Sequence, residues 1–246
     1  MTSYLRLNYR ILYWLIAGPL RKQPPKIRHV FQQMIRIGVD AIPMAGLTAF
    51  SIGLTLAMQA SHELGKMGAH MYVPNLVSVS LLRELGPLLI AVIVIGRSGS
   101  AVTAELGAMR VSEEIEALHV MAVNPVRFLI VPRFLAMLVM LPVLTVFGNY
   151  LGMVGGWSIC HFALDMSTSG YIMLSMEASK VGDLYSGLCK SFVFAWLIIT
   201  IACDAGLKVE GGAEGVGLAT TQSVVHSLLA VLVANAILTA LFFFST

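Results

Sequence analysis

The residues best suited to chemistry in this chain are charged side chains set among apolar ones. Arg83 and Glu84 stand between Leu81-Leu82 and Leu85, near the start of a long apolar stretch. A charge inside a bilayer costs roughly 2.5–3.5 kcal/mol at its centre, so such residues usually face a cavity or a partner. Neighbouring residues point about 100° apart on a helix, so each of the two should have its own partner. Two readings stay open, a binding cavity or a purely structural helix anchor.

Other signatures of chemistry are missing from the sequence. It contains no Walker A phosphate loop, no HExxH and no GxSxG. The six histidines have no metal-ligand spacing, and Cys160, Cys189 and Cys203 are scattered, with no CxxC pair. The glycine-rich stretch at 211–217 is expected to be a cytoplasmic connector. We therefore expect no catalytic residues, metal or cofactor in this chain, and no enzyme activity.

The composition predicts an all-α integral membrane protein. Hydrophobic residues make up 57% of the 246 and charged residues 12%, against about 25% charge in soluble domains. About 20 residues of helix cross a bilayer core, and only helices can satisfy their own backbone in lipid. Five stretches are long enough, and the second and third exceed one crossing, so they should tilt, break or extend. They are residues 38–60, 76–106, 130–160, 186–206 and 219–244.

The N-terminal segment, residues 1–36, carries seven Lys/Arg and no acidic residue. Its apolar residues fall largely on one helical side and Arg6 and Arg10 on the other, which favours an amphipathic interfacial helix over a short soluble one. Residues 37–246 form the five-span domain. With the N-terminus inside, eleven Lys/Arg lie in inner segments and three, Lys66, Lys180 and Lys190, in outer ones. This bias predicts a cytoplasmic N-terminus and a C-terminus outside.

A short amphipathic segment at about 111–123 separates the second and third spans. Ser112 is a helix-start signal, and Glu113, Glu114 and Glu116 follow near the positive end of the helix dipole. Ile115, Leu118 and Ala122 form a narrow apolar side, and Asn124-Pro125 ends the segment. It is too short to span. It is suited to docking on a partner, although an ordinary solvated helix stays possible.

Two stretches of small residues predict close helix packing. The third span contains Gly148, Gly152 and Gly156, which form two overlapping GxxxG steps. The second span repeats the spacing with Gly96, Ser100 and Ala104. The partner helix can belong to the same subunit or to a second copy.

The motifs of this chain resemble those of the MlaE/YrbE permease family. The resemblance runs from about residue 35 to the end and is densest at 82–133. It rests on residues 82–87, Gly96-Arg97, 104–107, Met109-Arg110, Glu113-Glu114, Asn124-Pro125, Pro132-Arg133, 215–221 and Val224-Val225. Asn124 stands where many relatives have Asp, and Leu218 and Gln222 where relatives often have Arg.

The resemblance implies a role in lipid transport. It implies the inner-membrane permease homodimer of an ABC transporter that moves phospholipids between the inner and outer membranes and maintains outer-membrane lipid asymmetry. The implied partners are an ABC ATPase, a periplasmic MCE-domain hexamer, a small STAS-domain subunit and phospholipid. Segment 111–123 would be the coupling helix, with Glu113, Glu114, Ile115 and Leu118 on the ATPase.

A central cavity in the dimer follows as a hypothesis, with Glu84 lining it and Arg83 near the lipid headgroup. The alternative function is a stand-alone secondary transporter or channel.

Overall fold

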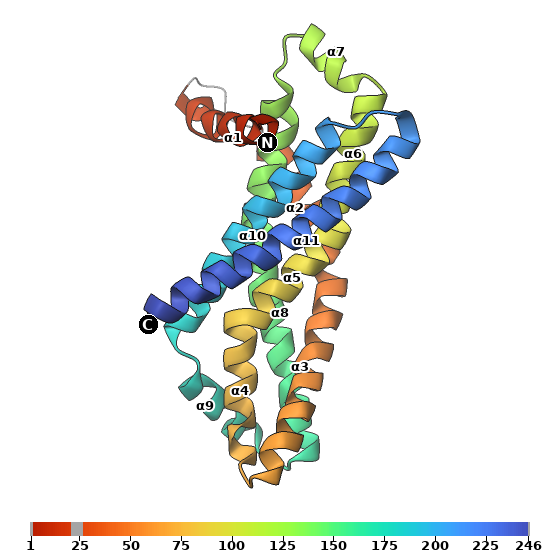
Figure 1. The fold of residues 1–246 in the computed structure, drawn as a ribbon. Helices are drawn as coiled ribbons and strands as arrows, with labels where there is room; N and C mark the ends of the chain where they lie inside the picture. Colours follow the sequence, from red (N-terminus) through yellow and green to blue (C-terminus); the bar gives the residue numbers. More distant parts are fainter. Residues whose placement is uncertain (1, 21–26, 246) are drawn as a thin grey trace. The chain divides into compact units, whose positions relative to one another are not determined.

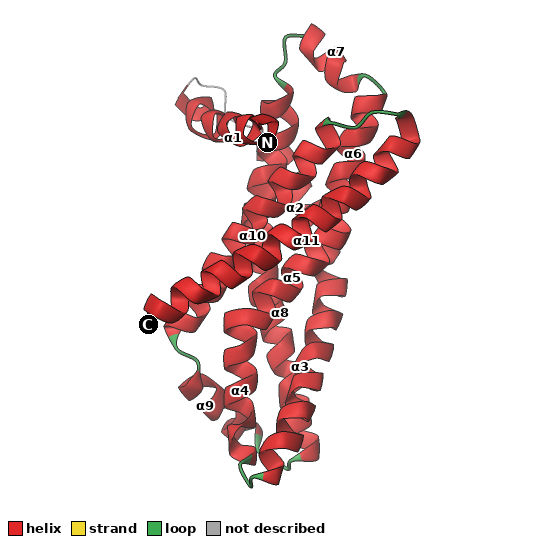
Figure 2. Ribbon diagram, viewed as in Figure 1, coloured by secondary structure: helices red, strands yellow, loops and turns green. Residues whose placement is uncertain are grey.

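The computed structural model describes residues 2–20 and 27–245, and all regular structure in these residues is helical (Figure 2). The predicted all-α class is therefore confirmed. Arg21, Lys22 and Lys26, part of the predicted basic N-terminal segment, lie outside the described residues.

The helices follow one another as labelled in Figure 1. They are α1 (Thr2–Leu20), α2 (Ile27–Ile37), η1 (Val39–Ala41), α3 (Ile42–Lys66), η2 (His70–Tyr72), α4 (Val73–Ser80), η3 (Leu81–Leu85), α5 (Gly86–Val94), η4 (Ile95–Gly99), α6 (Ser100–Val111), α7 (Glu114–Val120), η5 (Val126–Ile130), α8 (Val131–Ala163), α9 (Thr168–Ala178), α10 (Val181–Leu207) and α11 (Gly212–Ser245).

Five helical stretches in the described chain are long and apolar enough to cross a membrane, as predicted. They are Ile27–Lys66, His70–Val111, Val126–Ala163, Val181–Leu207 and Gly212–Phe244. The prediction was wrong for the glycine-rich stretch, because α11 begins at Gly212 and most of the expected connector is helical. Gly211 and Gly212 have positive φ, and a Cβ on Gly215 would lie 1.8 Å from the Glu210 carbonyl oxygen, so this turn needs all three glycines.

The second span is broken by two π-helical turns, η3 and η4. Pro87 has no N–H, so the helix cannot form its ordinary bond at that point. The Gly86 N–H instead bonds the carbonyl of Leu81, five residues back. π turns are rare and often occur at functional sites. Arg83 and Glu84 lie on η3, and Arg97 lies on η4.

The chain forms two compact units, each built from three separate segments. The first unit is Met1–Ala41, Val92–Leu141 and Val193–Ala234, and the second is Ile42–Ala91, Pro142–Phe192 and Asn235–Thr246. Helices α5, α8, α10 and α11 each contribute residues to both units. The boundary expected at residue 36 stays a sequence prediction.

Ion pairs connect separate chain segments within the first unit. Glu105 pairs with Arg36 at 3.0 Å and with the buried Arg133 at 3.1 Å. Arg97 lies 3.6 Å from Asp40 and donates to the Arg36 carbonyl. Arg97 and Glu105 thus each have their own partners. Arg133 lies in α8, within the predicted third span, and its side chain is only 4% exposed.

Helix α1 packs on α10 in the first unit. The Trp196 indole donates to Asn8 at 3.0 Å, and the Tyr4 and Thr200 hydroxyls are 2.8 Å apart. Leu7 and Ile11 are buried, whereas Leu5 and Leu12 are exposed. Part of the predicted apolar side therefore packs on protein, and the other part is free to contact lipid.

Glycines let α3 and α8 approach closely in the second unit. A Cβ on Gly53 would lie 1.9 Å from the Gly152 carbonyl oxygen, and one on Gly155 would lie 2.2 Å from that of Phe50. The three predicted seam glycines lie against other segments of the same unit. Gly148 faces Ile90, Gly152 faces Leu81 and Ala49, and Gly156 faces Val77 and Tyr171.

Replacing Gly53 or Gly155 by Ala should lower the thermal stability in detergent. Neither α3 nor α8 can move a backbone carbonyl aside cheaply, so we expect a loss of about 1–3 kcal/mol or more. Gly152→Leu should also destabilise the unit by overpacking against Leu81. Gly217→Ala is the control, because a Cβ there would meet nothing within 4 Å. Equal melting temperatures for all these variants would contradict the close packing.

Candidate functional site

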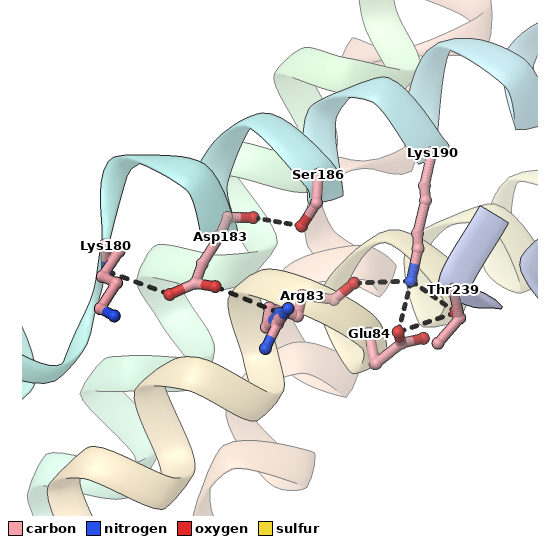
Figure 3. A network of polar contacts seen from close by, with 7 residues as sticks. All are labelled: Arg83, Glu84, Lys180, Asp183, Ser186, Lys190 and Thr239. Atoms are coloured by element: carbon pink, nitrogen blue, oxygen red, sulfur yellow. Dashed lines mark hydrogen bonds and ion pairs between the residues drawn. The ribbon is translucent and has the colours of Figure 1, made fainter. Parts of the chain in front are cut away.

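Arg83 and Glu84 have separate partners within the second unit (Figure 3). Arg83 Nε lies 3.1 Å from Asp183 Oδ1, at the start of α10. Asp183 Oδ2 in turn accepts the Lys180 backbone N–H at 3.0 Å, which caps the first turn of α10. The Arg83 partner is thus held in position by its own helix end.

Glu84 pairs with Lys190 of α10 and with two polar side chains of α11. Lys190 Nζ donates to Glu84 Oε1 and, at 2.8 Å, to Thr239 Oγ1. The Thr239 hydroxyl donates to the same carboxylate oxygen at 2.9 Å, and Asn235 Nδ2 donates to Oε2 at 3.3 Å. The Glu84 carboxylate therefore joins three helical segments that are far apart in the sequence.

Pro87 explains the third contact of Lys190. In an α-helix the Arg83 carbonyl would accept the N–H of residue 87, which proline does not have. That carbonyl accepts Lys190 Nζ instead, at 3.0 Å. The irregular backbone at η3 therefore leaves the Arg83 carbonyl able to accept a hydrogen bond from the buried Lys190 ammonium.

Burial differs strongly across this polar network. The Lys190 side chain is 2% exposed, whereas those of Glu84 and Arg83 are 37% and 40% exposed. A buried ammonium is tolerated only when it is paired and hydrogen-bonded. Two cations and two anions balance one another, and the exposed members are Arg83 and Glu84.

A cavity of about 150 Å³ lies beside the network. Its lining combines the polar groups with two aromatic rings, and consists of Arg83, Glu84, Ser186, Lys190, Thr239, Phe242 and Phe243. Charged groups next to an apolar wall suit an amphiphilic ligand. Among the described residues, no three His, Cys, Asp or Glu side chains are grouped so that they could hold a metal ion.

The predicted docking segment differs in detail from the expectation. Ser112 closes α6, with its hydroxyl donating to the Ala108 carbonyl at 3.0 Å, so it does not start the next helix. Glu113, with φ of 60°, is the residue before α7. The left-handed turn at Glu113 separates α6 from α7, so the short helix begins later than the start signal at Ser112 predicted.

Of the three residues predicted to form the apolar side of this segment, only Ala122 is exposed. Ile115 is only 5% exposed, so its side chain supports α7 from within and cannot contact a partner. Leu118 is half-buried. Val120 and Met121 are 87% and 63% exposed, and Glu113 and Glu114 are exposed as well. Arg110 pairs with Glu116 and ties α7 to α6.

Sequence reasoning missed the main partner of Glu84. Lys190 was counted as an outer-segment lysine, but it lies within α10 and is buried. The signal was present, because a lone lysine inside an apolar spanning helix needs a partner. Asp183, in the first turn of α10, gave no comparable signal, and neither did the uncharged Asn235 and Thr239 within α11.

Removing the Glu84 charge should destabilise the chain more than removing the Lys190 charge. Glu84→Gln leaves a buried ammonium without its counter-ion, which costs about 3–5 kcal/mol. Lys190→Met leaves a carboxylate that is 37% exposed and still accepts hydrogen bonds from Thr239 and Asn235. Thermal unfolding in detergent compares the two variants, and the double variant should lose less than the sum. A larger loss for Lys190→Met would show that this account of burial is wrong.

Comparisons with known proteins agree on one family. A sequence profile described as Permease MlaE matches residues 30–241. The intermembrane phospholipid transport system permease protein MlaE of Haemophilus influenzae is 36% identical over 241 residues, covering 97% of this chain and 91% of the relative. A protein of Rickettsia prowazekii named as a probable ABC transporter permease is 33% identical, covering 96% and 91%. A similarly named protein of Synechocystis is 37% identical, covering 89% and 83%. The chain is an integral membrane protein and belongs to the MlaE permease family.

Proposed function

We propose that this chain is the membrane subunit of an ABC transporter that moves phospholipids between the inner and outer membranes, and so maintains outer-membrane lipid asymmetry. The observation that carries the proposal is the charged network beside a cavity with an aromatic wall. The names of the relatives support it, since one is called an intermembrane phospholipid transport permease and others ABC transporter permeases.

Arg83 is the proposed phosphate ligand. Its pair with Asp183 uses Nε, which leaves the two terminal guanidinium nitrogens to bind a phosphate. Glu84 lines the same cavity, but its oxygens already accept from Lys190, Thr239 and Asn235. The role of Glu84 is therefore to neutralise Lys190 and hold the wall of the cavity. Phe242 and Phe243 would contact the acyl chains.

The energy source must be a separate subunit, because the sequence has no Walker A loop. The exposed Glu113, Glu114, Val120 and Met121 around α7 form the proposed contact with an ATPase. We also propose a homodimer, an MCE-domain hexamer and a STAS-domain subunit, on the family resemblance.

The proposed location is the inner membrane, with the N-terminus cytoplasmic and the C-terminus periplasmic. The excess of Lys/Arg in one set of connecting segments supports this orientation. Lys190 and Arg133 lie inside α10 and α8, so one charge leaves each count and ten inner Lys/Arg remain against two outer ones. A reporter enzyme that works only in the periplasm should be active when it is fused after Thr246, and one that works only in the cytoplasm should be inactive there. Activity of the cytoplasmic reporter alone would show that the C-terminus is cytoplasmic and would contradict the proposed orientation.

A photoreactive residue in place of Phe243 should crosslink phospholipid in an Arg83-dependent way. Phe243 is 74% exposed and lines the cavity beside Arg83. Arg83→Gln should reduce the crosslink several-fold, measured by mass spectrometry of the purified chain. The control is the same probe in place of Leu232, an exposed residue of α11 outside this cavity. Equal crosslinking with and without Arg83 would place the headgroup elsewhere.

Reversing the charges of Glu113 and Glu114 should weaken the contact with the ATPase. Both acids are exposed beside α7, so Glu113→Lys with Glu114→Lys should leave membrane insertion intact. We expect less ATPase to copurify, or ATP hydrolysis that no longer drives lipid transport. Glu177→Lys, at an exposed position in α9, is the control. Wild-type copurification and transport in the double variant would refute the assignment.

A further inference from the structure

Helix α9 has an exposed apolar side that neither the fold nor the proposed site uses. Tyr171 and Ser175 are its buried residues. On the opposite side Ile172, Met173 and Met176 are 47%, 70% and 73% exposed. Ser169 and Glu177 lie at the two ends of this side. An apolar surface of this kind on a short helix indicates something that covers it.

The buried side of α9 contacts membrane-spanning segments. It lies beside α4, which belongs to the span His70–Val111 (Figure 1). A Cβ on Gly156 would lie 2.9 Å from Val77 of α4 and 3.0 Å from the Tyr171 hydroxyl. That hydroxyl donates to the Met153 carbonyl of α8 at 2.9 Å. Thus α9 folds back along α8 and α4 instead of projecting from their ends.

The depth of this contact follows from helix geometry. Met153 is ten residues before Ala163, the end of α8, which corresponds to about 15 Å along the axis. The span Val126–Ala163, which contains α8, has 38 residues, so it is about 57 Å long and exceeds a hydrocarbon core of about 30 Å by about 27 Å. Tyr171 therefore lies at the edge of the hydrocarbon region or deeper when this excess is shared between the two ends of the span.

Short connections and aromatic residues are consistent with this depth. Four residues separate α8 from α9, and two separate α9 from α10, so both neighbouring spans restrain the helix. The Trp157 indole donates to the Thr168 hydroxyl at 3.2 Å and stacks on His161 at 5.4 Å. Trp is enriched where a membrane meets water. The start of α9 is thus at the expected level of the interface.

We infer that α9 is a lipid-facing re-entrant helix, with Ile172, Met173 and Met176 in contact with the acyl chains of the leaflet on its side of the membrane. The side chains offer no charge to a protein partner until Glu177, at the edge of the surface. They match the chemistry of a hydrocarbon surface. The inference is independent of the proposed transport activity.

Fluorescence quenching tests the position of Met173. Cys160, Cys189 and Cys203 are first replaced by Ala, and Met173→Cys is labelled with an environment-sensitive fluorophore. The full chain is reconstituted in vesicles of phosphatidylethanolamine and phosphatidylglycerol. A nitroxide on the acyl chain of added phosphatidylcholine reports lipid contact, and aqueous iodide reports water. Asp165→Cys, at an exposed position in the connection before α9, is the matched control.

We expect the nitroxide lipid to quench the Met173 label several-fold more than the Asp165 label, and iodide to show the reverse order. Iodide quenching as strong at Met173 as at Asp165 would place α9 in water and overturn the inference. Weak quenching by both agents would show that protein covers this side, which also overturns it. Should Met173→Cys fail to fold, Met176→Cys gives the same reading. Since no ATP or transport is needed, a failed transport assay leaves this result unaffected.

Discussion

A lysine buried in an apolar helix needs an opposite charge, and much of the second unit is arranged around that need. Lys190 is almost fully enclosed, and the Glu84 carboxylate, the Thr239 hydroxyl and the Arg83 carbonyl surround its ammonium. These groups come from three separate parts of the chain. Separating them would leave a charge in a low-dielectric interior, so the pair joins η3, α10 and α11. The half-exposed Glu84 then reaches the cavity beside Arg83.

Proline makes this arrangement possible at the backbone level. Pro87 removes one N–H, the helix adjusts by a π turn, and the freed Arg83 carbonyl completes the coordination of Lys190. Glycines in the same unit determine how closely its helices pack. Gly53, Gly152 and Gly155 bring α3 and α8 to backbone contact, and Gly156 leaves space for Tyr171. The result is a rigid support for a site that has both charged and aromatic walls.

The contacts of α9 also bear on whether this helix lies in the membrane or in water. A helix of 11 residues is too short to span, so length alone would assign it to the aqueous side. Its contacts with α4, Met153 and Gly156 place it alongside spanning helices. In a membrane protein an apolar exposed surface needs no protein partner, because lipid can cover it. The exposed apolar side of α9 is therefore compatible with a stable fold and does not require a protein partner.

The sequence by itself determined the class of this protein, the five spans and the need of Arg83 and Glu84 for separate partners. These follow from local quantities, namely hydropathy over about 20 residues and the angle between neighbours on a helix. The tertiary structure decided which partners meet. Lys190, Asn235 and Thr239 lie more than 100 residues after Glu84, and no local pattern encodes that pairing. It also moved the start of the short helix from Ser112 to Glu114 and buried Ile115, because contacts with neighbouring segments outweigh a helix-start signal.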